Sequence, residues 1–238
     1  MSAATAGLVV ALPEECRSLT RRRVGRGDCL RLGPTQLVCV AGAGGENAVR
    51  AAHRLVDAGA AGLISWGCAA GLAPALRAGD LCLPIETVDV RGSHRPVSEA
   101  WHWRAETALQ AAVGLHSGPL LTADRIAATP AAKRSLAAEF SAIAADMESA
   151  GVAAVALERG VPFLVVRAIA DPADMALPSA VLRAADADGN VRRLALLGHV
   201  LLHPSDCSDL LKLASHFRAA LQTLTRAADA LGPDLQLA

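Results

Sequence analysis

Two acidic motifs lie in the second half of the chain, each at the end of an apolar stretch. Ala-Asp-Met-Glu-Ser ends at Ser149, and Val-Arg-Ala-Ile-Ala-Asp ends at Asp171. In proteins that alternate strands and helices, ligands bind at the carboxyl ends of strands, so two carboxylates delivered there can face one substrate. These residue types and their placement predict acid–base chemistry by paired carboxylates.

The stretches before the two motifs have the character of strands. Residues 141–146 are small and apolar, and a helical pattern opens at Met147. Residues 161–169 are rich in β-branched side chains, and Asp171-Pro172 follows. Because proline keeps the preceding residue out of the helical region, Asp171 is predicted to be extended at a strand end.

Short apolar runs recur along the chain and alternate with helical patterns. The clearest helix is predicted over residues 46–58, with Gly59 as its stop, and a long amphipathic helix over 210–231. Residues 21–36 predict a hairpin-like excursion, and residues 67–71 a tight turn. The apolar runs occupy residues 7–12, 36–41, 62–66, 80–90, 115–121, 142–146 and 161–169.

This order of elements predicts an α/β fold. We expect a twisted mixed sheet flanked by helices, formed by one domain over residues 1–238, with 176–238 as a more divergent helical part. No linker or internal repeat divides the chain.

Composition narrows the classes of function. Lys plus Arg and Asp plus Glu both total 23, aromatic residues make up 3%, and tyrosine is absent. Without a basic face or base-stacking aromatics, the chain is not expected to bind nucleic acid. The first six residues lack a positively charged leader, and no run reaches the roughly eighteen apolar residues of a membrane span. A cytoplasmic location is expected.

The cysteines form no recognisable site. They show no C-x-x-C pair and no metal-type spacing with the seven histidines. We expect reduced thiols and predict neither a metal nor an organic cofactor. The six positions are Cys16, Cys29, Cys39, Cys68, Cys82 and Cys207.

Four stretches together resemble the nucleoside phosphorylase superfamily, especially its methylthioadenosine and adenosylhomocysteine nucleosidase branch. They match in order and spacing over residues 7–175, which is more specific than any single motif. The stretches are GLVVALPEE from Gly7, GCAAGL from Gly67 with RAGD from Arg77, DMES from Asp146, and VVRAIAD from Val165.

Within that superfamily the chain most resembles the hopanoid-associated phosphorylases, a group implied to remove adenine from adenosylhopane. This finer resemblance rests on the DMES wording and on features of residues 177–224. They are Leu-Pro at Leu177, Asp-Ala-Asp-Gly at Asp186, Arg192-Arg193, His203-Pro204 and Leu-Leu-Lys-Leu at Leu210.

The resemblance implies roles for three carboxylates. Asp171 matches the general acid that protonates the base near N7, and Glu148 matches the carboxylate that binds the ribose hydroxyls. Glu15 matches the residue that activates water, with Glu14 as the alternative register. Without the other motifs, the favoured alternatives are that Asp171 is a turn or cap residue, that Asp146 is the N-cap of a helix whose dipole favours Glu148, and that Glu15 is a solvated acid in a first helical turn.

The resemblance also implies substrate contacts. Met147 is expected to pack against the sugar, Gly67 and Cys68 to approach it, and Arg167 to belong to the binding residues. Residues 122–127 match the loop that cradles the base, with Ile126 over the ring and the Ala127 backbone at its edge; an ordinary connection is the alternative. Cys68 stands where Ser or Thr is usual, Ala70 where glycine is common, and Ala170 where serine is common.

One departure from the family's sequence pattern predicts the nucleophile. Phosphate-using members carry an arginine where this chain has Ser65, which favours water over phosphate, although Arg17 or an arginine from residues 21–26 could supply the charge that phosphate needs.

An adenosyl lipid would need an apolar channel beyond the ribose 5′ position. Apolar residues 194–202, flanked by Arg192, Arg193 and His203, could rest on a membrane or pack against the core, and Trp101 and Trp103 pose the same ambiguity.

The leading hypothesis is therefore an adenine-releasing nucleosidase that acts on a lipid-linked nucleoside. The alternatives are a phosphate-dependent purine nucleoside phosphorylase, a soluble methylthioadenosine or adenosylhomocysteine nucleosidase, and a nucleoside-binding module without activity. The resemblance also implies a homo-oligomer.

Overall fold

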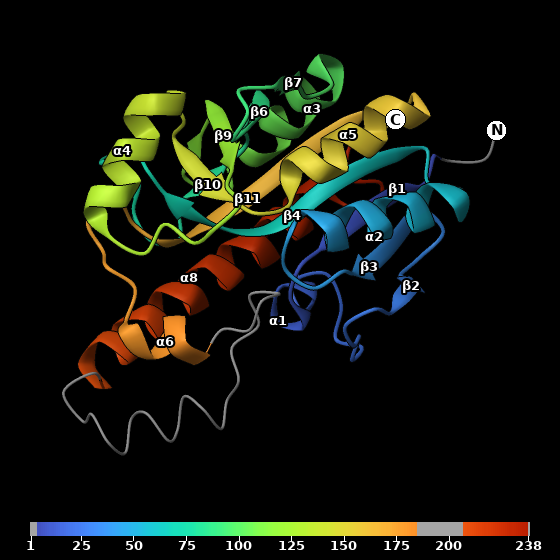
Figure 1. Cartoon of the computed structure of the whole chain (residues 1–238). Coiled ribbons are helices and arrows are strands. Elements are labelled where there is room, and N and C mark those ends of the chain that lie inside the picture. The colour runs from blue at the N-terminus through green and yellow to red at the C-terminus, as the bar shows by residue number, and fades with distance from the viewer. Residues whose placement is uncertain (1–3, 185–206, 238) are drawn as a thin grey trace.

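A computed structural model of the chain describes residues 4–184 and 207–237. Within them, a single mixed sheet of eleven strands forms the centre (Figure 1). Four strands run parallel in the order β3 (Gln36–Val40), β1 (Ala6–Val10), β4 (Gly62–Gly71) and β11 (Phe163–Asp171). The others are β2 (Cys29–Arg31), β5 (Leu81–Cys82), β6 (Glu86–Asp89), β7 (His94–Pro96), β8 (Leu115–His116), β9 (Pro119–Thr122) and β10 (Ala144–Asp146).

Helices cover both faces of the sheet, which confirms the predicted α/β class. The helices α2 (Gly45–Asp57) and α5 (Ser149–Arg159) pack together on one face, while α3 (Glu99–Leu109) and α8 (Cys207–Leu231) pack on the other (Figure 1). Successive side chains of a strand point to opposite faces, so β11 contributes side chains to the cores on both faces of the sheet. Leu164 and Val166 belong to the core beside α8, and Phe163 and Val165 to the core beside α2 and α5.

The remaining helices are shorter or lie toward one end of the sheet. They are α1 (Pro13–Cys16), α4 (Pro130–Phe140) and α6 (Ser179–Ala184). The predicted helices are confirmed with small shifts: the one expected over residues 46–58 is α2, and Gly59 follows it in the left-handed region. The one expected over 210–231 is α8, whose buried side chains recur at helical spacing at Ala220, Leu224, Ala227 and Leu231.

The tight turn predicted at residues 67–71 is wrong, because β4 continues through it to Gly71. Parallel pairing with β11 holds the strand extended, with Gly67 opposite Arg167 and Ala69 opposite Ile169. Its last residues then pair antiparallel with β10. The helix expected to open at Met147 begins two residues later, at Ser149.

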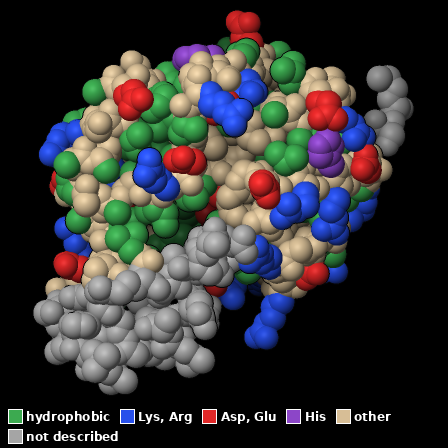
Figure 2. Space-filling view, in the orientation of Figure 1, with side chains coloured by type: hydrophobic (Ala, Val, Ile, Leu, Met, Phe, Trp, Pro, Cys, Tyr) green, Lys and Arg blue, Asp and Glu red, His purple; other side chains and the backbone are tan. Residues whose placement is uncertain are grey.

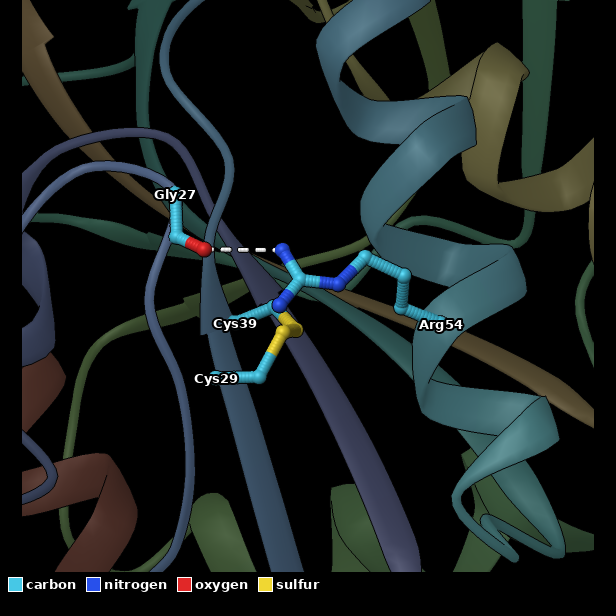
Figure 3. The surroundings of a disulfide bond; sticks show 4 residues. All are labelled: Gly27, Cys29, Cys39 and Arg54. Carbon is cyan, nitrogen blue, oxygen red and sulfur yellow. Dashed lines mark hydrogen bonds between the residues drawn. A yellow bond between two sulfur atoms is a disulfide. The ribbon is translucent and has the colours of Figure 1, made fainter.

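The expectation of six reduced cysteines is wrong at one pair, because a disulfide joins Cys29 and Cys39 (Figure 3). The two residues face each other where β2 runs antiparallel to β3, which confirms the hairpin predicted for residues 21–36. Beside the bond, Arg54 of α2 donates a hydrogen bond of 2.7 Å to the Gly27 carbonyl (Figure 3). The pairing was missed because hairpin register, not spacing, brings the thiols together. Cys16, Cys68 and Cys82 are free.

The two tryptophans have different environments. Trp101 is fully buried, and its indole donates to the Leu235 carbonyl at 2.8 Å, whereas Trp103 is 66% exposed. The apolar run at 194–202 and its basic flanks lie outside the described residues. Among the helices that are described, none is long and apolar enough to cross a membrane.

Candidate active site

The carboxylate of Glu15 is placed by a short helix that starts directly after β1. Pro13 opens α1 with its backbone angle preset for a helix, and Glu15 then turns back so that its Oε2 accepts from the Leu12 N–H at 3.0 Å. Its Oε1 accepts from the Cys68 N–H at 2.7 Å. The residue is only 3% exposed, so it is not the solvated acid considered as an alternative.

Burial sets the proton affinity of Glu15. Removal from water raises the pKa of this carboxyl, while the Arg167 charge and the two backbone N–H donors oppose that rise. The net direction is upward, which makes Glu15 a stronger base than an exposed glutamate.

Glu148 lies between β10 and α5, with 6% of its surface exposed. Its Oε1 accepts from the Gly44 N–H at 2.9 Å, at the start of α2. Burial raises the pKa of Glu148 to about 7, with Arg167 acting to lower it and Asp146 to raise it.

The guanidinium of Arg167 is buried between these carboxylates. Its Nη2 lies 2.6 Å from Asp146 Oδ2 and 3.6 Å from Glu148 Oε2, and it donates to Ser65 Oγ at 2.7 Å. One guanidinium therefore balances acidic groups on β10, on the start of α5 and, through its charge, on α1.

Asp171 ends β11, as the Asp-Pro pattern predicted. A shift in the pairing register with β4 occurs between Ile169 and Asp171, which turns the end of the strand. Burial raises the pKa of Asp171, and the ammonium of Lys133, whose Nζ lies 2.8 Å from Oδ2, opposes the rise. Asp171 is thus separated from Arg167 and has a cation of its own.

These groups meet at a cavity of about 200 Å³. Most of the residues named from the sequence line it: Glu15, Glu148 and Asp171, with Met147, Cys68, Ile126 and Ala127. Small and apolar side chains complete the wall, among them Leu12, Ala43, Ala69, Ala70, Ala123, Ala145, Ala170 and Leu177. Carboxyl groups in two settings therefore border one cavity: Glu15 and Glu148 feel the charge of Arg167, and Asp171 lies beside Lys133.

Gly67 and Arg167 do not line the cavity; they lie behind its wall. A Cβ on Gly67 would be 2.5 Å from Arg167 Nη1 and 2.7 Å from Glu15 Oε1, so the glycine gives these two side chains room. In the structure, the Cys68 N–H is taken by Glu15. The expectation that Gly67 and Arg167 contact substrate stays a prediction.

Several residues of the site were missed from the sequence. The N-cap of α5 is Glu148, not Asp146. Asp146 accepts from the Ser149 N–H at 3.2 Å, binds Arg167 and accepts from Thr122 Oγ1 at 2.8 Å. The Ser149 hydroxyl donates to Asp146, and its oxygen lies 2.9 Å from Ser65 Oγ. The polar Ser65 inside an apolar strand was a sequence signal that could have revealed this network. Lys133, in an alanine-rich helix, showed no signal of its contact with Asp171.

Within residues 4–184 and 207–237, no group of three or more His, Cys, Asp or Glu side chains is arranged to hold a metal ion.

Fold and site together define a class: an α/β protein with four buried carboxyl groups, Glu15, Asp146, Glu148 and Asp171, at strand and helix ends around one small cavity. The phosphorylase superfamily model matches residues 5–197, and the chain belongs to that family. Among curated proteins, none matches.

Solved structures of the same fold include two nucleosidases. The 5′-methylthioadenosine/S-adenosylhomocysteine nucleosidase of Neisseria meningitidis, in complex with methylthio-immucillin-A, is 18% identical with a TM-score of 0.71, covering 95% of this chain and 97% of that one. The S-adenosylhomocysteine nucleosidase of Streptococcus pyogenes, in complex with 5-methylthiotubericidin, is 18% identical with a TM-score of 0.68 and the same coverage.

Futalosine hydrolase of Helicobacter pylori is 19% identical with a TM-score of 0.66, covering 95% of this chain and 98% of that one. At these identities the likeness concerns the fold.

Proposed function

We propose that this protein is a nucleosidase that hydrolyses the N-glycosidic bond of a purine nucleoside and releases adenine. The observation that carries the proposal is the convergence of Glu15, Glu148 and Asp171 on one cavity, in the two electrostatic settings described above. Cleavage of this bond builds positive charge on the sugar and negative charge on the departing base. It therefore needs carboxylates near the sugar and an acid near the base.

In the proposed reaction, Asp171 donates its proton to N7 of the purine as the bond between N9 and C1′ breaks, and the bonding electron pair leaves with the base. Glu15 takes a proton from water, whose oxygen bonds to C1′. Glu148 holds the ribose hydroxyls, and Met147 packs against the sugar. The reaction leaves Glu15 protonated and Asp171 ionised, and transfer of one proton through solvent restores both.

Two observations support water, not phosphate, as the nucleophile. The buried Arg167 is already paired with Asp146 and contacts Glu148, so its charge is balanced. The exposed arginines considered as phosphate ligands, Arg17 and those in residues 21–26, are not among the residues that line the cavity. A phosphate dianion in the site would face Glu15 and Glu148. The cation that lines the cavity among the described residues, Arg125, is exposed and lies 3.7 Å from Asp124.

For the substrate, we propose adenosylhopane, which would yield a ribosylhopane for hopanoid biosynthesis. The apolar wall of the cavity, with Leu12, Ala43 and Leu177, is suited to an apolar 5′ extension. Hydrophobic side chains also gather around a hollow on the face shown in Figure 2. Of the tail features that suggested a hopanoid substrate, Leu177 borders the cavity, whereas those at 186–204 lie outside the described residues.

The names of the similar structures favour a second candidate, methylthioadenosine or adenosylhomocysteine. The deciding experiment measures adenine release from adenosylhopane and from methylthioadenosine, each with and without phosphate. Phosphate-independent release from the lipid is the expected result. Preference for methylthioadenosine would overturn the lipid assignment, release only with phosphate would make the protein a phosphorylase, and ligand binding without release would leave a binding module.

Assembly and membrane contact belong to the same proposal. Large apolar side chains are exposed at Ile85, Val90 and Leu157, which supports a homo-oligomer, and light scattering on the purified protein tests it.

Exposed Leu182 and Leu211, on α6 and the start of α8, support a peripheral contact with the membrane that holds the lipid substrate. Flotation with phospholipid vesicles tests that contact.

A further inference from the structure

The single buried residue of α4 is a lysine. Lys133 is fully buried, whereas the other ten residues of Pro130–Phe140 are exposed or partly exposed. It lies near the start of the helix, where the macrodipole disfavours a positive charge. Because burial and helix position both oppose a lysine here, its partners must account for it.

Those partners all belong to the chain segment that begins with Asp171. The ammonium donates to the carbonyls of Asp171 at 3.2 Å, Pro172 at 2.7 Å and Met175 at 3.0 Å. A further bond, from the Leu177 N–H to the Ala128 carbonyl at 2.8 Å, ties the same segment to the residues before α4. Lys133 thus fixes the backbone on which the proposed acid stands.

The same ammonium acts on the carboxyl group of Asp171. Nζ lies 2.8 Å from Oδ2, yet this buried oxygen has no aligned hydrogen-bond donor among the described residues. Three carbonyls already take the three N–H directions of the lysine. Lys133 therefore acts on the carboxyl through its charge and through the 2.8 Å contact with Oδ2, and both oppose the rise in the pKa of Asp171.

Few other charges face Asp171. The thiol of Cys68 on β4 lies near enough to feel its charge, and burial raises the pKa of that thiol well above its usual value. Arg125 also borders the cavity, but its side chain is 89% exposed and lies 3.7 Å from Asp124. Among the described residues, Lys133 is the buried cation that lies beside Asp171.

We propose that Lys133 is a positioning residue that holds Asp171 at the end of β11 and sets the pH range over which it can act as the acid. This inference rests on the proposed function for its kinetic consequence. Removing the ammonium takes away a charge that favours the ionised carboxyl, so Asp171 stays protonated to higher pH. A lysine that only stabilised the fold would not move that titration.

The experiment compares pH profiles of kcat/KM for adenine release in the parent, Lys133→Met and Lys133→Gln, with Arg134→Met as a control on an exposed neighbour of the same helix. We expect lower rates and an alkaline limb shifted upward by about one pH unit or more in both Lys133 variants, as for loss of a nearby opposite charge. The control should keep the parent profile. An unmoved limb in the folded variants, or failure of both to fold, would overturn the proposal.

A second readout separates this proposal from the proposed function. Titration of the Asp171 carboxyl by ¹³C NMR in aspartate-labelled protein, with the signal assigned through Asp171→Asn, needs no substrate. A higher carboxyl pKa in Lys133→Met than in the parent would support the role of Lys133 even if no nucleoside were cleaved. An unchanged pKa would overturn it even if the parent released adenine.

Discussion

At the scale of single residues, the site separates its carboxyl groups by the cation that each one faces. Glu15 and Glu148 share the buried Arg167, whereas Asp171 has Lys133. Groups of one chemical kind acquire different roles when their environments differ, which is how one site can supply both acid and base. The proposed roles are therefore testable one side chain at a time.

Replacement of the acid is the first prediction. Asp171→Asn keeps the size of the side chain but cannot deliver a proton, so we expect kcat for adenine release to fall by about 10²–10⁴-fold, the range for loss of general acid catalysis. Binding of a nucleoside analogue, measured by calorimetry, should change much less. Turnover at the parent rate would rule out Asp171 as the acid.

The second prediction distinguishes two neighbouring glutamates. Glu15→Gln removes the buried base that lines the cavity, whereas Glu14 does not line it. We expect a loss of at least 10²-fold in kcat for Glu15→Gln and a near-parent rate for the matched Glu14→Gln. Steady-state kinetics of both variants, with circular dichroism to verify folding, check this. The opposite ranking would place the base at Glu14.

At the scale of elements, the site depends on how closely β4 can pass the side chains beside it. At Gly67, β4 pairs with β11, and the space a side chain would need is already occupied by Glu15 and Arg167. The Glu15 carboxylate from α1 and the Arg167 guanidinium from β11 thus meet at this point of β4. This crowding requires glycine. An alanine here would disturb the two side chains of the site more than the pairing of the strands.

The third prediction follows from that crowding. In Gly67→Ala the new methyl group would displace the Glu15 carboxylate, the Arg167 guanidinium, or both, because each lies under 3.0 Å from it. We expect kcat/KM to fall by about 10²-fold, as for other small misplacements of catalytic groups. Gly33→Ala, where the added methyl group meets nothing within 4 Å, serves as control. Equal activity in both variants would contradict this account.

At the scale of the whole molecule, the buried carboxyls couple function to stability. Burial raises the pKa of Glu148 from 4.5 to about 7, so the folded protein holds this proton more tightly than the unfolded chain does. Stability from this group is therefore full below about pH 4.5 and is lost as the pH rises toward 7. Glu15 and Asp171 act in the same direction.

The fourth prediction concerns that loss of stability. The free energy of unfolding from denaturant titrations should decline between pH 5 and pH 7 with a contribution from Glu148 on the order of 1 kcal/mol per pH unit. Glu148→Gln cannot ionise, so its decline should be smaller and its stability at pH 7.5 higher than that of the parent. Glu46→Gln, on a side chain that is 93% exposed, should follow the parent. Identical slopes in all three proteins would refute the coupling.

The sequence alone determined the class of fold, the strand end at Asp171 and the two long helices, because each of these depends on local features. The resemblance singled out Glu15, Glu148 and Asp171, whose roles stay predictions. Alternation, helical spacing and the Asp-Pro pair act over a few residues, and the four motifs keep their order along the chain.

Only the tertiary structure decided which distant residues contact one another. Strand pairing extended β4 through the expected turn, hairpin register joined Cys29 to Cys39, and chain packing brought Lys133 to Asp171 from 38 residues away. Such contacts join residues that are distant in sequence, so no local pattern of residue types encodes them.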